Sequence, residues 1–521
     1  MLGTVLDELK LSASSSQSRN PPRAQTAWLD GLRGYAALLV FFCHFGIVYW
    51  NNLRYAYGTV IPLHSIIPNG TNYPGGQPVW NGTNVTALEP YRHTYPIQLP
   101  IVRLLADGDP MVVIFFLVSG YSLSLKPTSL IRAGPTSHPH LLTTLSSSVF
   151  RRPIRLILPI LASTLLVVFA VTIGIYTHAS TFASSSRTFH SYFHGWAFEA
   201  TPHVLPSLNL QLIDWFYSLY DLLDFFTHFH WTMTRYDIHL WTIPVELRCS
   251  LLLFLTHLAL APLVTRARLS LLTISILLAL TWGDTWEMAL FWTGQLLCEI
   301  DSLHPPSPSL VLRKRHLFSL FLSLYLLSTP LVWAHCTPFY RPFTWVWIPG
   351  LRAYETSRFW QCLGATGLMI LVARVPVYRG FFSNGLARYL GRISFALYLV
   401  HGPVLRSVGY SLAFKLWQVV GREGWRYHFC VCLTGAVVGP MTIAVANVFC
   451  RRVDEPVVRF ARRVEGWMKG EGEEGGEPGV WGWDGEGRGG EERWAPGHGR
   501  GDSGVSVEEA ELGRVGRGSL S

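Results

Sequence analysis

The chain has 521 residues, of which 49% are apolar, 13% aromatic and only 14% charged. Charged residues make up about a quarter of a typical soluble protein, so this composition excludes most soluble enzymes and indicates a multi-pass membrane protein. The net charge of +9 comes from short basic clusters between apolar runs, a pattern that orients membrane helices and argues against nucleic-acid binding.

Ten apolar segments define the predicted fold, an all-α, polytopic bundle of transmembrane helices. A span needs roughly 20 mostly apolar residues, and the candidate segments are 34–50, 99–122, 154–177, 238–262, 269–284, 286–300, 316–334, 358–375, 393–415 and 428–450. The fifth and sixth are short and could form a re-entrant pair. The aromatic stretch 209–230 carries three aspartates and predicts an interfacial helix rather than a span.

The composition divides the chain into three regions. Residues 1–27 form a polar N-terminal segment, 28–460 the transmembrane domain, and 465–521 a tail rich in Gly, Glu and Arg. The two flanking regions are predicted to be disordered because they carry too little apolar surface to offset the chain entropy lost on folding.

Two features predict the orientation of an integral membrane protein of the endomembrane system or plasma membrane. Basic residues gather on one side of the ten-span arrangement, which should be cytosolic. The opposite side holds the loop 51–98, which contains all three N-x-S/T glycosylation acceptors, Asn69, Asn81 and Asn84. Both termini are then expected in the cytosol and the glycosylated loop in the lumen or outside the cell.

The eight cysteines fall almost entirely within apolar segments and show no CxxC or metal-binding spacing. We therefore expect buried thiols, with no disulfide framework, no metal site and no permanently bound cofactor.

The first apolar segment carries two ionisable side chains, Arg33 and His44, within DGLRGYAALLVFFCHF (30–45). They are eleven residues apart, which on a helix is about three turns, so they share one face about 16 Å apart along the axis. Ionisable groups are costly in a membrane and mark functional sites by default. The alternative for His44 is a packing histidine bonded to a neighbouring helix.

A second cluster of ionisable residues begins the third segment. Arg152 and Arg155, in RRPIR (151–155), are three residues apart and so lie on one helical face. Two guanidinium groups suit a phosphate-bearing ligand. The alternative is that they serve only as the positive charge that orients the helix.

Three later motifs add polar groups. Glu246, in HLWTIPVEL (239–247), could orient a histidine or stabilise its imidazolium form, or could simply pair with Arg248. Ser119, beside Gly120, is favoured as a packing residue over a nucleophile because no GxSxG motif surrounds it. His401, in ISFALYLVHGPV (393–404), is a weak signal alone.

Together these motifs resemble the acyltransferase-3 family of integral membrane O-acyltransferases, in a fungal-type eukaryotic form. The resemblance rests on motifs in the family's order: LDGLRGYAALLVFFCH (29–44), FFLVSGYSL (115–123), RRPIRL (151–156), LWTIPVEL (240–247), ISFALYLVHGPV (393–404) and DEP (454–456). It implies about ten spans, a cytosolic acyl-CoA co-substrate, most simply acetyl-CoA, and transfer to a hydroxyl of a glycan, lipid or small metabolite.

The resemblance also implies roles for individual residues. Arg33 and His44 match family residues needed for activity, Arg152 and Arg155 match a motif linked to the CoA donor, and Glu246 matches the family's acidic residue. The family usually has serine after the tryptophan of that last motif, where this chain has Thr242, and Pro244 precedes Val245. This departure affects the local helix geometry around Glu246.

The expected reaction uses His44 as a general base on the acceptor hydroxyl, with Arg152 and Arg155 holding CoA phosphates and Arg33 a phosphate or the thioester region. A covalent acyl-histidine is an open alternative. Two other classes remain: a multi-pass transporter of a small molecule or anion, which also uses intramembrane His, Arg and Glu, and a non-catalytic membrane partner with the same fold.

Overall fold

A computed structural model describes residues 22–50, 53, 55–59, 94–184, 186–194, 201–224, 234–281, 285–306, 312–331, 333–346 and 353–470. Contacts divide the chain into Met1–Lys469 and Gly470–Ser521, and the first unit is described here. The predicted glycosylation sites, the segment 1–21 and the tail from 471 onward lie outside the described residues.

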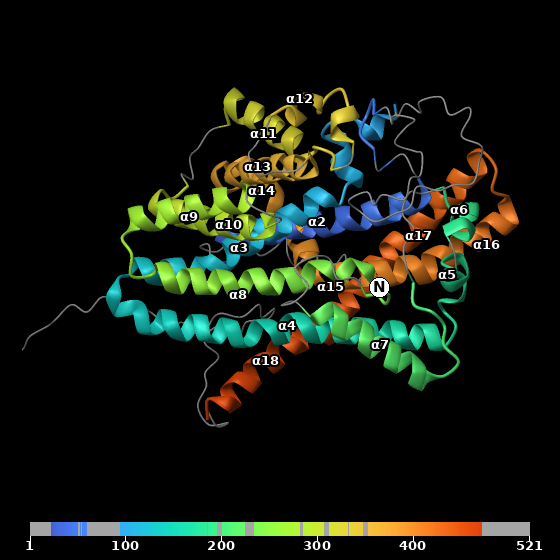
Figure 1. Cartoon of the computed structure of the whole chain (residues 1–521), viewed down its shortest axis with the longest axis horizontal. Coiled ribbons are helices and arrows are strands. Elements are labelled where there is room, and N and C mark those ends of the chain that lie inside the picture. Colours follow the sequence, from blue (N-terminus) through green and yellow to red (C-terminus); the bar gives the residue numbers. More distant parts are fainter. Residues whose placement is uncertain are drawn as a thin grey trace, which may run out of the picture. The chain divides into compact units, whose positions relative to one another are not determined.

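Every named element in the described ranges is a helix (Figure 1). The long helices are α2 (Pro22–Tyr49), α3 (Asp109–Arg132), α4 (His138–Thr172), α8 (Thr242–Leu260), α9 (Thr265–Thr281), α10 (Trp286–Leu303), α13 (Ala353–Arg374), α15 (Gly385–Val404) and α17 (Trp425–Phe449). The shorter α-helices are α5 (Thr177–Phe182), α6 (Ser186–Tyr192), α7 (Leu208–Leu223), α11 (Lys314–Leu327), α12 (Arg341–Thr344), α14 (Pro376–Phe382), α16 (Tyr410–Val420) and α18 (Glu455–Met468).

Short 3₁₀-helical and π-helical turns lie between several of these helices. The 3₁₀ turns are η4 (Pro96–Gln98), η5 (Val102–Ala106), η6 (Pro135–Ser137), η7 (Ile238–Trp241) and η8 (Ala334–Cys336). The two π-helical turns are η9 (Leu405–Gly409), which joins α15 to α16, and η10 (Cys450–Asp454), which joins α17 to α18.

The predicted helical character is confirmed in the described residues, several of whose helices are apolar enough to span a membrane. Among the described residues, five helices are long and apolar enough to cross a membrane, or six if the bent pair Thr356–Arg374 and Pro376–Phe382 forms one span. Two of the other predicted segments are helical but short: α9 has 17 residues and α11 has 14, fewer than the roughly 20 that a straight span requires. The count of ten stays a prediction.

The boundaries of the predicted domain also shift. The first helix begins at Pro22, inside the segment 1–27 that was expected to be disordered. At the other end α18 continues to Met468, four residues into the predicted tail. An ion pair between Glu465 and Arg151 of α4, at 3.1 Å, ties this last turn to the bundle.

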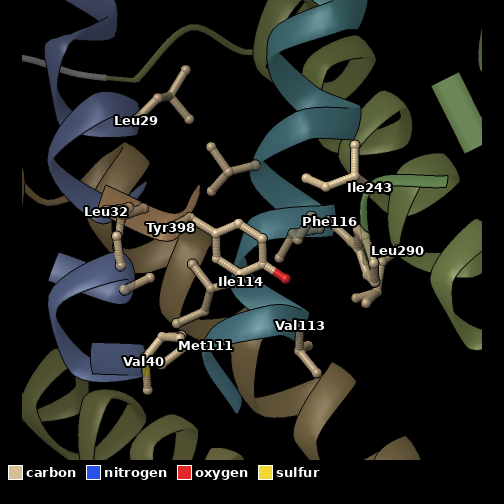
Figure 2. Close-up of a cluster of buried hydrophobic side chains, with 14 of the residues drawn as sticks. Leu29, Leu32, Val40, Met111, Val113, Ile114, Phe116, Ile243, Leu290 and Tyr398 are labelled. Atoms are coloured by element: carbon tan, nitrogen blue, oxygen red, sulfur yellow. The ribbon is translucent and has the colours of Figure 1, made fainter. Parts of the chain in front are cut away.

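Apolar side chains from α2, α3, α8, α10 and α15 form the buried core (Figure 2). Leu29, Leu32 and Val40 of α2 contribute one side of it. Side chains of α3 fill the centre, and Tyr398 of α15 closes it with its hydroxyl directed towards α8. Since lipid is as apolar as these side chains, close fit rather than exclusion of water holds such helices together in a membrane.

Two glycines set the distance between α2 and α15. A Cβ on Gly34 would lie 2.4 Å from the backbone nitrogen of Gly391, and a Cβ on Gly391 would lie 2.4 Å from the carbonyl oxygen of Asp30. Only glycine permits backbones to come so close. Ten residues beyond each glycine, in the same direction along both helices, stand His44 and His401, so this contact brings the two histidines together.

A second close approach involves Gly120, the neighbour of Ser119. A Cβ on Gly120 would lie 2.3 Å from the carbonyl oxygen of Phe291 in α10, and one on Gly294 would lie 2.4 Å from the backbone nitrogen of Tyr121. Small residues therefore let α3 and α10 touch.

Candidate active site

Three histidines from separate parts of the sequence meet at one point. His44 lies on α2, His239 on the turn η7 and His401 on α15. The Nε2 of His239 lies 3.0 Å from the Nδ1 of His44, and the ring of His401 is centred 5.3 Å from that of His44 and 4.6 Å from that of His239. His239 and His401 are buried, and His44 is partly exposed.

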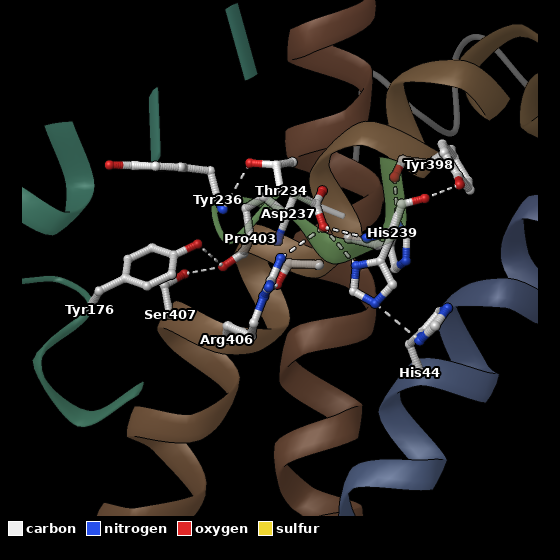
Figure 3. A network of polar contacts seen from close by, with 12 residues as sticks. His44, Tyr176, Thr234, Tyr236, Asp237, His239, Tyr398, Pro403, Arg406 and Ser407 are labelled. Carbon is white, nitrogen blue, oxygen red and sulfur yellow. Dashed lines mark hydrogen bonds and ion pairs between the residues drawn. The ribbon is translucent and has the colours of Figure 1, made fainter. Parts of the chain in front are cut away.

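A buried carboxylate and a buried guanidinium extend this cluster (Figure 3). The Oδ1 of Asp237 lies 2.7 Å from the Nδ1 of His239 and accepts a hydrogen bond of 2.7 Å from the Nη2 of Arg406. Asp237 is 1% exposed and Arg406 is not exposed at all. A buried charge is stable only when it is paired and hydrogen-bonded, and each of these two groups supplies the other's partner.

Local sequence fixes the geometry of the carboxylate. Asp237 caps the turn η7, and its Oδ1 accepts from the backbone nitrogen of His239 at 3.2 Å, as aspartate commonly does at the start of a helix. The hydroxyl of Tyr398 donates to the carbonyl oxygen of His239. The π-helical turn η9 follows Pro403 and carries Arg406 to the far side of Asp237 (Figure 3).

Electrostatics keeps Asp237 ionised. This residue immediately precedes the spanning segment Ile238–Leu260. Burial alone would raise the pKa of Asp237, but His239 and Arg406 outweigh burial and hold that pKa below its ordinary value. A permanent carboxylate therefore lies beside the histidines.

The three histidines are also the group of described residues with the spacing of a metal site, since one nitrogen of each lies within 4.8 Å of the others. The sequence predicted no metal here. A metal ion would need the lone pairs of His239 Nε2 and His44 Nδ1 to converge on it. Those two atoms lie 3.0 Å apart, within hydrogen-bonding distance, and we describe this contact as a hydrogen bond that shares one proton.

A second polar cluster lies further along α2 and α8. The Nη2 of Arg152 donates to Glu246 Oε1 at 2.6 Å, and its Nε donates to Ser250 Oγ at 3.0 Å. Glu246 Oε1 also accepts from Ser119 Oγ at 3.1 Å. Arg33 of α2 also belongs to this cluster. Its Nη2 donates to Ser122 Oγ at 3.2 Å, and its positive charge acts on that of Arg152.

Arg155 belongs to a different charge environment from Arg152, although the two share one face of α4. The charge of Asp454, in the DEP motif after α17, acts on Arg155 and partly offsets the repulsion from Arg152. The RRPIR and DEP motifs, about 300 residues apart, are thus neighbours in the structure.

The structure changes the role expected for Glu246. The described side-chain bonds of this carboxylate go to Arg152 and Ser119, not to a histidine. Glu246 stands seven residues beyond His239, which on a helix is about two turns or 10 Å. Asp237 occupies the position beside a histidine that the sequence analysis gave to Glu246.

The unusual residues of the LWTIPVEL motif are accommodated. Pro244 falls in the first turn of α8, where its missing backbone donor has no intrahelical partner to lose. The hydroxyl of Thr242 lies 2.6 Å from that of Tyr398, so threonine supplies the hydroxyl that serine would supply. The helix around Glu246 is regular.

Three members of the histidine cluster, Asp237, His239 and Arg406, were not assigned a role from sequence. One local signal was present: an acidic residue two positions before a histidine, directly ahead of an apolar run. Arg406 gave a second, as an arginine inside the predicted span 393–415.

Comparison with known proteins places most of the chain in one family. Residues 26–445 match the acyltransferase domain family, acyltransferase-3. The O-acetyltransferase PaAT-1 of Phomopsis amygdali is 29% identical over 472 residues, covering 84% of each protein. Acyltransferase R4 of a Phoma species is 26% identical over 476 residues, covering 85% of this chain and 96% of that protein. Acyltransferase clz18 of Cochliobolus lunatus is 26% identical over 466 residues, covering 83% of this chain and 94% of that protein.

No solved structure matches the chain. The family match nevertheless covers most of the sequence, and the related proteins are fungal acyltransferases. The chain therefore belongs to the acyltransferase-3 family of membrane-embedded acyltransferases.

Proposed function

We propose that this protein transfers an acetyl group from acetyl-CoA to a hydroxyl of a glycan, lipid or small metabolite, with His44 as the general base. The observation that carries the proposal is the placement of His44. Its imidazole is partly exposed and contacts the buried His239, which in turn is bonded to the buried carboxylate of Asp237. Support for an acetyl group comes from the related Phomopsis protein, which is named an O-acetyltransferase.

The reaction balances without a metal or redox partner. A nitrogen of His44 takes the proton of the acceptor hydroxyl while its oxygen bonds to the thioester carbonyl carbon. The tetrahedral intermediate then breaks its carbon–sulfur bond, and CoA leaves as a thiolate that takes the proton from His44. The products are the ester and free CoA. In the covalent alternative, His44 attacks the carbonyl itself and an acyl-imidazole forms first.

The arginine cluster supplies the donor end. Arg33 of α2 and the two arginines near the middle of α4, Arg152 and Arg155, provide guanidinium groups, and such groups bind phosphate oxygens well. Arg152 is already bonded to Glu246, whereas Asp454 offsets Arg155 only in part. Arg155 is therefore the residue from which we expect the largest contribution to phosphate binding.

The first test measures transfer directly. Membranes of a heterologous host making the protein receive deuterium-labelled acetyl-CoA, and labelled esters are sought by mass spectrometry among metabolites, lipids and released glycans. We expect labelled product with the parent and none with His44→Ala. The matched control is His178→Ala. His178 lies on α5, is also a half-buried histidine, and its Nδ1 is 3.1 Å from the hydroxyl of Ser411.

Each outcome of this test has a clear meaning. Equal labelling by a folded His44→Ala protein would remove the general-base role. Labelling that is lost in the His178 control as well would show a general loss of folding instead. Uptake of a compound without consumption of acetyl-CoA would favour a transporter. A labelled His44 peptide after rapid acid quench would establish the covalent route.

The donor site has its own test, binding of acetyl-CoA and of S-acetyl-pantetheine, which lacks the nucleotide phosphates. Arg155→Gln should weaken acetyl-CoA binding by about 10- to 100-fold, as expected for one charge-assisted bond. The same substitution should leave S-acetyl-pantetheine binding unchanged. Equal effects on both donors would contradict phosphate recognition by Arg155.

A further inference from the structure

We infer that Asp237 and His239, held in place by Arg406, are positioning residues that fix the tautomer of His44 and leave its Nε2 as the basic nitrogen. This inference rests on the proposed function, because it assigns a role in the same reaction. It adds three residues to the site and names the atom of His44 that takes the proton.

The direction of each hydrogen bond follows from the carboxylate. A carboxylate can only accept, so His239 must donate from Nδ1 to Asp237 Oδ1, 2.7 Å away. A neutral imidazole that carries its proton on Nδ1 has its lone pair on Nε2. That lone pair faces His44 Nδ1 at 3.0 Å, so His44 must donate from Nδ1. The lone pair of neutral His44 is then on Nε2.

Arg406 fixes the start of this series of bonds. Its Nη2 donates to the same Oδ1 of Asp237 at 2.7 Å, and its Nε donates to the carbonyl oxygen of Gly402 at 3.3 Å. Asp237 is thus gripped by Arg406 from one side and by the backbone nitrogen of His239 from the other. Both of these bonds fall on Oδ1, the oxygen that also contacts His239 Nδ1, and they favour the unprotonated form of that oxygen.

The same bonds stabilise the product of proton transfer. When His44 becomes an imidazolium, its Nδ1 proton can move towards His239, whose other nitrogen is bonded to a carboxylate. The positive charge is then shared with Asp237 through one intervening ring. An orienting carboxylate raises the basicity of a catalytic histidine in this way.

The charged and titratable groups around His44 come from several elements. His239 and Asp237 approach from η7, and His401, Tyr398 and Arg406 approach from α15 and η9. Next to His44 on α2, Cys43 and Ile47 border a small cavity that is also lined by the Arg103–Asp107 pair and by Asp109.

His401 completes the enclosure but takes no part in the relay. Its Nδ1 is 2.7 Å from the carbonyl oxygen of Tyr398, which can only accept, so His401 carries its proton there. Its Nε2 is buried without a hydrogen-bond partner. This nitrogen offers a second acceptor beside His44 and His239, and it is also the third atom that a metal ion would need.

The test compares pH profiles of acetyl transfer for the parent, Asp237→Asn, Arg406→Gln and His239→Gln. Asp237→Asn removes the negative charge, so kcat should fall by about 100-fold, at the lower end of what general-base catalysis contributes. The acid limb of kcat/KM should move to lower pH. Arg406→Gln removes the opposing positive charge and should move that limb to higher pH. KM for acetyl-CoA should change little in either variant, because the arginine cluster is intact.

His239→Gln is the conservative variant, and it is compared with His239→Ala. Its amide oxygen can still accept from His44 Nδ1, so it should keep more activity than His239→Ala, although neither can share the proton with Asp237. The control is Glu299→Gln, which neutralises a buried carboxylate paired with Arg268 at 3.2 Å between α9 and α10, outside the histidine cluster. Its pH profile should match that of the parent.

A second readout separates failure of this inference from failure of the proposed function. Diethyl pyrocarbonate reacts with histidine only in its neutral form, so the pH dependence of His44 modification, followed by mass spectrometry of the His44 peptide, reports the protonation of His44 with no acyl donor present. Unshifted profiles in Asp237→Asn and Arg406→Gln by both readouts would overturn the relay. An unreactive His44 in the folded parent would also overturn it, because an acceptor hydroxyl must reach the same nitrogen.

Metal analysis of the purified protein tests the alternative that the three histidines bind a metal ion. A stoichiometric metal ion that is lost on substitution of His44, His239 or His401 would overturn the relay, because metal binding needs a lone pair where the relay places a proton. If the parent transfers no acyl group but His44 shows the two opposite shifts, the relay stands and the proposed acyl transfer is wrong.

Discussion

Replacing Arg152 with glutamine separates the structural role of this arginine from its proposed role in donor binding. Arg152 and Glu246 form a 2.6 Å ion pair between α4 and α8, with side chains 15% and 20% exposed. Arg152→Gln leaves Glu246 with Ser119 as its remaining described partner. Breaking a buried pair costs about 3–5 kcal/mol, and the residual exposure of both side chains places this one near 3 kcal/mol.

The double variant Arg152→Gln/Glu246→Gln sharpens the test. Removing both charges leaves no unpaired ion, so most of the lost stability should return. Acetyl-CoA binding should not return, because the guanidinium is still missing. Thermal unfolding in detergent and equilibrium binding of acetyl-CoA measure the two quantities independently.

A matched pair on α9 and α10 serves as the control. Arg268 and Glu299 lie 3.2 Å apart with side chains only 6% and 1% exposed. Arg268→Gln should therefore destabilise the protein at least as much as Arg152→Gln while the folded fraction binds acetyl-CoA normally. Weaker binding in the Arg268 variant, or a double variant as unstable as the single one, would refute this reasoning.

Three further outcomes are expected. Gly402→Ala should abolish transfer with little effect on acetyl-CoA affinity, because a Cβ there would lie 2.4 Å from His239 Nδ1 and 2.7 Å from Asp237 Oδ1; separate kcat and binding measurements check this. The depressed pKa of Asp237 means that its contribution to stability is fully present above its unfolded pKa, about 4, and is lost as pH falls through the lower folded value. Melting curves of the parent should show this acid loss, and those of Asp237→Asn should lack that part of it. Glutamine at each glycosylation acceptor should remove an endoglycosidase-sensitive mass, and an unchanged mass for all of them would contradict a lumenal first loop; these acceptors are Asn69, Asn81 and Asn84.

The sequence identified the ionisable residues that stand out against an apolar background. His44, Arg33 and Arg152 could be found because each is conspicuous within or beside a long apolar run. Asp237 and His239 precede such a run and resemble ordinary loop residues. Their importance depends on a contact between His239 and His44 across 195 positions of sequence, and one sequence holds no information on such pairings.

The same limit explains why the partner of Glu246 could not be predicted. Glu246 was the conspicuous acid, so it was paired with the conspicuous histidine. The helical rise instead carries it about two turns from His239 and into contact with Arg152. The apolar pattern likewise predicted helices correctly but could not tell a full span from α9, which has only 17 residues.

The separation of the two clusters is itself an argument about the donor. Arg33 and His44 lie on one continuous helix, α2, about 16 Å apart along its axis, and α8 carries Glu246 and follows directly on the turn that bears His239. A compact anion could contact only one of these clusters at a time. Coenzyme A carries its phosphates and its thioester at opposite ends of a long, thin pantetheine arm, so it can place charge among the arginines and the carbonyl at His44 in a single bound state. Transport of a small anion does not require a histidine, such as His44, whose tautomer is fixed through a buried carboxylate. The site therefore combines an arginine cluster with a distant, partly exposed imidazole that is hydrogen-bonded to His239. This combination favours group transfer from a long phosphate-bearing donor.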